Sequence, residues 1–152
     1  MRAFFISALA LSCLAFAGCG RPSAECRNFY DLSPEQRASF LRASPIEKQL
    51  DLYECGVYQE PPIDYSNVVA DGGEKIIPAL RARLNAVERP HACFKGDLLR
   101  IFERLAERGE LRGRQDVLEQ LRDVPAGIPF DVCRPEAQER LKNIEQAYSK
   151  YP

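Results

Sequence analysis

Four cysteines spaced widely along the chain constrain its fold more than any other feature of the sequence. They lie at intervals of 29, 38 and 40 residues, at Cys26, Cys55, Cys93 and Cys133. In an exported domain, an even number of cysteines indicates disulfides, and four cysteines can pair in three ways. We favour Cys26–Cys55 and Cys93–Cys133, because each bond then closes one half of the chain. A metal site or a redox pair is disfavoured, since the sequence has no C-x-x-C and only one histidine.

The N-terminal segment indicates that the chain is exported. Met1 and Arg2 give a positive start, and residues 3–17 are apolar apart from two serines. This is the plan of a signal peptide, and the apolar run is shorter than the roughly 20 residues of a transmembrane helix. Two cleavage sites compete. In the first, Ala-Phe-Ala at residues 15–17 is the A-x-A cleavage motif of an ordinary secretory signal peptide, which would be cut before Gly18.

The second cleavage site, FAGC at residues 16–19, resembles the lipobox of bacterial lipoproteins. In that family the signal peptide is cut just before the cysteine, and the cysteine carries the lipid. Cleavage before Gly18 would leave five cysteines and hence one unpaired thiol, whereas lipidation of Cys19 leaves four. The resemblance implies a signal peptide over 1–18 and a lipid anchor on Cys19 in the bacterial cell envelope. The anchored domain would lie on the periplasmic side or the cell surface, and Gly20 favours the outer membrane over the inner.

The mature chain would run from residue 19 to residue 152, a length that suits one domain with its own core. Residues 19–24 contain glycine, proline and serine and are predicted to form a short tether, and residues 25–152 a single helical domain. The 20 basic and 22 acidic side chains that remain after cleavage give a net charge of about −2. Charge therefore gives no argument for a nucleic-acid partner.

Helical periodicity dominates the mature chain, and no convincing alternation of period two is found. The sequence SPEQ at residues 33–36 is a capping box for a helix over 34–43, and SPIE at residues 44–47 predicts the same device for a helix over 45–57. Asp97 is expected to cap a later helix that Gly109 ends. Further helices are predicted over 65–70, 73–84, 97–108 and 114–123, and from about 135 onward. We therefore predict an all-α fold, a compact bundle or irregular array of about six or seven short helices braced by two disulfides.

One of these segments resembles a known module. GEKIIPALRARL, residues 73–84, is similar to the second helix of a HEAT-type repeat, where an Ile-Pro-x-Leu start is common. The resemblance covers 12 residues, and no second copy lies at the roughly 40-residue spacing of such repeats. We interpret the segment as an ordinary helix with Pro78 near its first turn.

Motifs of known catalytic sites are missing from the sequence. It has no H-E-x-x-H, no G-x-S-x-G, no glycine-rich phosphate loop and no Glu-Ser dipeptide typical of all-α lytic transglycosylases. His91, the single histidine, could act as a general base, but no acid is visible beside it and we prefer a structural role. Arg100, Arg104 and Arg108 share a helix face that could receive an anionic partner, although the interleaved glutamates favour a salt-bridged surface.

The best candidate for a binding surface is the Pro-Pro loop around residues 60–64. Glu60 and Asp64 lie on this loop, and Tyr58 and Tyr65 lie on either side of it. Aromatic and charged side chains on a rigid loop are typical of recognition surfaces, and the competing interpretation is a loop tied to the core by its tyrosines. We predict a non-catalytic binding or interaction module whose partner is another envelope protein, in a narrower version an immunity or inhibitor protein. The alternative is a cell-wall-acting enzyme with a carboxylate pair that the sequence does not reveal; neither version calls for a cofactor or a metal.

Overall fold

The structure, a computed structural model, describes residues 23–58 and 62–151, and this part of the chain contains helices and no strand. The all-α prediction is therefore confirmed. The α-helices are α1 (Ala24–Tyr30), α2 (Pro34–Ala43), α3 (Ile46–Val57), α4 (Ser66–Ala70), α5 (Ile77–Ala86), α6 (Phe94–Glu107), α7 (Gln115–Arg122) and α8 (Arg134–Tyr148). Two short 3-10 turns, η1 (Gly73–Ile76) and η2 (Arg89–His91), precede α5 and α6. The predicted signal peptide, Cys19 and Glu60 lie outside the described residues.

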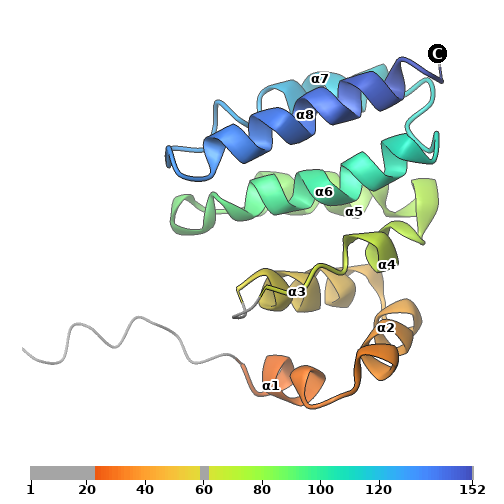
Figure 1. Cartoon of the computed structure of the whole chain (residues 1–152), viewed down its shortest axis with the longest axis vertical. Helices are drawn as coiled ribbons and strands as arrows, with labels where there is room; N and C mark the ends of the chain where they lie inside the picture. The colour runs from red at the N-terminus through yellow and green to blue at the C-terminus, as the bar shows by residue number, and fades with distance from the viewer. Residues whose placement is uncertain (1–22, 59–61, 152) are drawn as a thin grey trace, which may run out of the picture.

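The helices are stacked in layers along the long axis of the molecule (Figure 1). The pair α1 and α2 forms one end, α3 and α4 follow, and α5 with α6 separates them from α7 and α8 at the other end. The central helix is α6, which packs against α8, α4, α3 and α5. One face of α6 is fully buried, through Leu98, Leu99, Ile101, Phe102 and Leu105. Its arginines occupy the opposite face, because apolar residues recur at helical spacing along this segment.

Most predicted helix limits agree with the structure, and the first capping box is present. The Ser33 hydroxyl accepts a hydrogen bond from the Gln36 backbone N–H, and the Gln36 side chain accepts one from the Ser33 N–H. The second predicted capping box is wrong. Ser44 ends α2 instead, its hydroxyl donates to the Phe40 carbonyl over 2.8 Å, and α3 begins after Pro45 without a side-chain cap.

The start of α6 also differs from the prediction. Asp97 does not cap this helix, because the turn η2 leads directly into α6 at Phe94, three residues earlier. The predicted end is confirmed, since Gly109 follows the helix with a φ of 76°, a conformation that favours glycine. Pro78 lies in the first turn of α5, as predicted. The helix α1 was not predicted; its N-cap Ser23 falls inside the segment expected to be a tether.

Both favoured disulfides are confirmed. Cys26 of α1 is bonded to Cys55 of α3, with 5.9 Å between their Cα atoms. Cys93 and Cys133, the N-cap residues of α6 and α8, form the second bond, with 5.6 Å between Cα atoms. The two bonds therefore fasten the first helix to the domain and join the starts of the two longest helices. Across the described ranges, no helix is both long and apolar enough to cross a membrane.

Candidate functional site

The tyrosines predicted to flank the binding loop have different environments. Tyr65 is buried, its ring packs edge-on against Phe29 with 5.6 Å between centroids, and its hydroxyl lies 3.5 Å from the Arg37 guanidinium. Tyr58 is 51% exposed. Tyr65 therefore belongs to the core, whereas Tyr58 presents much of its ring to solvent.

Asp64 has a local structural role at the start of α4. Its carboxylate accepts a hydrogen bond from the Ser66 backbone N–H over 2.8 Å, and it lies 3.8 Å from the Arg100 guanidinium. This arrangement fixes the chain as it enters α4. The structure thus does not bring Asp64, Tyr58 and Tyr65 together as one exposed surface.

The arginine row of α6 is paired with acidic groups along its length. The pairs are Arg100 with Glu136 at 2.6 Å, Arg104 with Glu107 at 3.0 Å, and Arg108 with Asp71 at 3.2 Å. Since each guanidinium already has a carboxylate partner, this face is a salt-bridged surface of the fold.

A second polar cluster lies between α6 and α8 and could not be recognised in the sequence. Glu103 is almost fully buried and accepts hydrogen bonds from Arg140 over 2.9 Å and from Asn143 over 2.8 Å. A buried carboxylate requires such partners. These side chains come from positions about 40 residues apart, so no local spacing indicates the contact.

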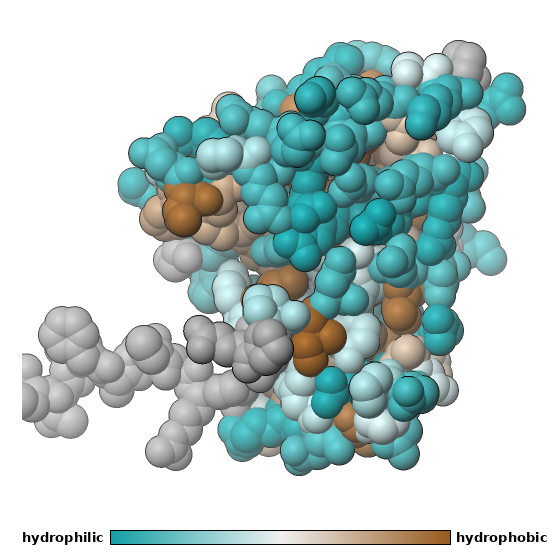
Figure 2. Space-filling view, in the orientation of Figure 1, coloured by the Kyte–Doolittle hydropathy of each residue, from teal (hydrophilic) through white to brown (hydrophobic). Residues whose placement is uncertain are grey.

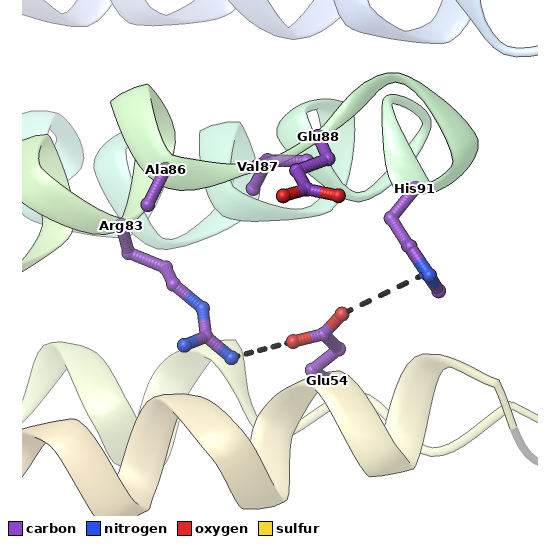
Figure 3. Close-up of a pocket in the computed structure, with 6 residues that line it drawn as sticks. All are labelled: Glu54, Arg83, Ala86, Val87, Glu88 and His91. Carbon is purple, nitrogen blue, oxygen red and sulfur yellow. Dashed lines mark hydrogen bonds and ion pairs between the residues drawn. The ribbon is translucent and has the colours of Figure 1, made fainter.

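The structure instead gathers polar groups in a recess between α3 and the segment that leads from α5 to η2. The recess has a volume of about 210 Å³ and is lined by Glu54, Arg83, Ala86, Val87, Glu88 and His91 (Figure 3). Glu54 comes from α3 and Arg83 from α5, while His91 ends the turn η2. We call this set of residues the α3–α5 recess.

Glu54 is the centre of the recess. Arg83 and His91 approach its carboxylate from opposite sides (Figure 3). One carboxylate oxygen lies 2.5 Å from Nη2 of Arg83, and the other lies 4.0 Å from Nδ1 of His91. Arg83 also contacts Asp51 over 2.8 Å. His91 therefore does have an acidic neighbour, which α3 supplies from 37 positions earlier in the chain.

Tyr58 forms the rim of the recess. Its hydroxyl lies 3.5 Å from Nδ1 of His91, and the two rings meet edge-on with 6.0 Å between centroids. Partial burial, with the negative charge of Glu54 and then of Asp97, raises the pKa of Tyr58 to about 12. The phenol therefore stays protonated at neutral pH and can donate a hydrogen bond. Glu54 lies in the last turn of α3 and Tyr58 directly follows this helix, so only their four-residue spacing could have indicated their proximity.

The recess offers carboxylates, a guanidinium and an imidazole at fixed positions, beside the half-exposed phenol ring of Tyr58. Such a set suits recognition of a polar or charged side chain. No group of three or more His, Cys, Asp or Glu residues arranged to hold a metal ion occurs in the described part of the chain. No protein-family model, curated protein or solved structure matches this chain.

Proposed function

We propose that the chain is a lipid-anchored, non-catalytic binding module of the bacterial cell envelope. The lipobox-like sequence before Cys19 supports the anchor, with the outer membrane favoured. The disulfides add to this argument. The four cysteines of the helical domain pair with one another. None of them can therefore form a disulfide with Cys19, which agrees with a lipid on that residue. Disulfides are typical of oxidising compartments such as the periplasm and the cell surface.

The α3–α5 recess and the rim residue Tyr58 are the proposed binding surface. The observation that carries this proposal is the position of Glu54 between Arg83 and His91, next to a half-exposed tyrosine. Tyrosine and arginine are the residues that contribute most often to binding energy at protein interfaces. The partner in this proposal is another envelope protein, and an immunity or inhibitor function is its narrower form.

Affinity capture tests this proposal. Native lipidated protein is captured from detergent-solubilised envelopes, and the bound proteins are identified by mass spectrometry. The variants Tyr58→Ala and Glu54→Gln are compared with Tyr151→Ala, which removes another exposed tyrosine at the far end of the molecule. We expect the recess variants to lose roughly tenfold or more of a stoichiometric partner, with Tyr151→Ala unaffected. Equal capture of the partner by all variants would show that the recess is not the binding surface.

One observation favours the alternative, a cell-wall-acting enzyme. Burial raises the pKa of Asp97 to about 6, and raised carboxyl pKa values are a property of general acids in glycoside-cleaving enzymes. Release of soluble fragments from purified peptidoglycan, measured for the wild type and for Asp97→Asn, separates the two functions. An enzyme would release fragments and lose that activity in the variant, whereas a binding module would release none in either form.

A further inference from the structure

An apolar tip projects from the connection between α7 and α8. Phe130 is 39% exposed and Val132 is 88% exposed. The tip is anchored on both sides, because Ile128 is fully buried and Cys133 is bonded to Cys93. Figure 2 shows an apolar patch on the surface at the left of the view, the side on which α6 and α8 begin. The fold thus holds two apolar side chains in solvent on a braced connection.

The tip lies on the same side of the molecule as the start of the domain, although α1 and the α7–α8 connection are at opposite ends of the long axis (Figure 1). Ser23 caps α1, and the Cys26–Cys55 bond fixes the first turn of α1 to the last turn of α3. Tyr58 follows directly after α3 and packs against His91. The turn that contains His91 leads into α6, whose N-cap residue Cys93 is bonded to Cys133, the residue next to Val132 of the tip. The starts of α1, α6 and α8 and the end of α3 therefore face the same way.

The length of chain before α1 indicates which surface this side of the molecule faces. Cys19 precedes Ser23 by four residues, and four residues of fully extended chain span at most roughly 14 Å. A lipid on Cys19 would therefore keep the start of α1 close to the membrane surface, on the side of the molecule that also carries the tip. We infer that the tip formed by Phe130 and Val132 contacts the lipid surface and sets the orientation of the domain, an inference that rests on the proposed lipid anchor.

The chemistry of the tip fits a phospholipid interface. Phenylalanine is among the side chains that membrane-surface segments bury at the boundary between headgroups and acyl chains, and Tyr58, on the same side, is of the type enriched where the bilayer meets water. Asp131 lies between the two apolar residues, and its carboxylate forms an ion pair with the Arg134 guanidinium, 2.7 Å away. The lipid attaches the domain at one point only, so a second apolar contact would restrict how the domain turns on the membrane.

A second copy of the chain is a poorer occupant. Stable protein interfaces bury roughly 1,000 Å² or more in total, and two side chains on one connection provide only a small part of such an area. The lipid surface also needs no complementary shape. His91 lines the α3–α5 recess and lies just before α6, on the same side of the molecule as the tip. A partner bound in the recess would therefore lie close to the same membrane.

Tryptophan fluorescence tests the contact, because the chain contains no tryptophan. The variant Val132→Trp places a single probe on the tip, and Tyr151→Trp places a comparison probe on a 41% exposed position beyond α8, on the opposite side of the molecule. Each mature lipidated protein is reconstituted into phosphatidylethanolamine–phosphatidylglycerol vesicles with and without brominated acyl chains. We expect blue-shifted emission and at least roughly twofold stronger quenching for Val132→Trp than for Tyr151→Trp.

Intact mass, measured first, shows whether Cys19 carries the lipid, so failure of the anchor is distinguished from failure of this inference. If the lipid is present and both probes are quenched equally weakly, the tip does not contact the bilayer. A blue shift that arises without vesicles, together with a doubled mass in light scattering, would identify a second copy as the occupant. Either result would overturn the membrane contact.

Discussion

Asp97 shows how one carboxyl group couples this fold to pH. It lies in the first turn of α6, and the Tyr53 hydroxyl donates to its backbone carbonyl over 2.9 Å. Burial is the largest cause of its raised pKa and outweighs the opposing effect of Arg100, 3.8 Å away. The folded protein therefore holds this proton up to about pH 6, whereas the unfolded chain releases it near pH 4.

We predict that Asp97→Asn stabilises the protein at neutral pH. Between about pH 4 and pH 6 the folded state binds more protons at Asp97 than the unfolded state, so the contribution of Asp97 to the unfolding free energy falls as pH rises. The variant should be more stable by roughly 1–3 kcal/mol at pH 7 and equal to the wild type below pH 4. Urea unfolding at several pH values measures this difference, and a less stable variant at pH 7 would contradict the assignment.

Glu136 provides a control of opposite sign. Hydrogen bonds from Arg140 and then Arg100 lower its pKa, so its charged form stabilises the folded state. The variant Glu136→Gln should therefore be less stable than the wild type at pH 7, and the difference should vanish as pH falls below the folded pKa.

Gly113 isolates the cost of a left-handed backbone conformation. Its φ is 69°, and a Cβ atom added there would meet nothing within 4 Å. We predict that Gly113→Ala lowers the unfolding free energy by about 1–2 kcal/mol, and that Gly113→Asn costs less because asparagine adopts this conformation more readily. Thermal unfolding of both variants gives the comparison. Equal stability of Gly113→Ala and the wild type would contradict the proposed strain.

At the scale of the helix, local signals predicted well where the ends of an element are determined locally. The limits of α2 follow from its capping box and from Pro34. The start of α6 follows instead from the turn η2 and the disulfide at Cys93, which are set by tertiary structure, so the expected cap at Asp97 was wrong. The helix α1 has only seven residues and a single buried apolar side chain, Phe29, so its periodicity is too weak to recognise.

Two serines with similar sequence contexts therefore have different predicted effects. Ser33→Ala removes the acceptor for the Gln36 N–H and should destabilise the protein by about 1 kcal/mol. Ser44→Ala removes only an exposed hydroxyl that donates to the Phe40 carbonyl, and should change stability by less than about 0.5 kcal/mol. Chemical denaturation of both variants checks this difference. A larger loss for Ser44→Ala would mean that the second capping box does form.

At the scale of the whole molecule, the sequence indicated the all-α class and the cysteine pairing but not the α3–α5 recess. A predicted disulfide is also a predicted contact between two residues that are far apart in the sequence, so the cysteines carry information about tertiary structure. The proximity of Glu54 to His91 depends instead on how α3 packs beside α5. No local pattern encodes that packing, so the predicted loop surface included Tyr58 but missed Glu54, Arg83 and Glu88.

The two disulfides should contribute similar amounts to stability, because the entropy lost by closing a loop grows only with the logarithm of its length. The bonded cysteines are 29 and 40 residues apart in the sequence. Each bond should contribute roughly 3–4 kcal/mol to the unfolding free energy in the chain-entropy model. We predict that Cys26→Ala/Cys55→Ala and Cys93→Ala/Cys133→Ala each lower the unfolding free energy by an amount of this order. Denaturant titration without reductant measures both losses. Unchanged stability in either double variant would contradict a structural role for that bond.

The anchor at Cys19 is the claim on which the envelope location and the membrane-facing tip both depend. Its most direct test is the non-reduced intact mass, with peptide mapping, of the protein purified from the membrane fraction of a bacterial host. We predict an N-terminus at Cys19 that carries a diacylglyceryl group, and four cysteines in the bonds Cys26–Cys55 and Cys93–Cys133. The Cys19→Ala variant, as a control, should stay uncleaved or be released from the membrane. A mature protein that begins at Gly18 with an unmodified Cys19 would contradict the account.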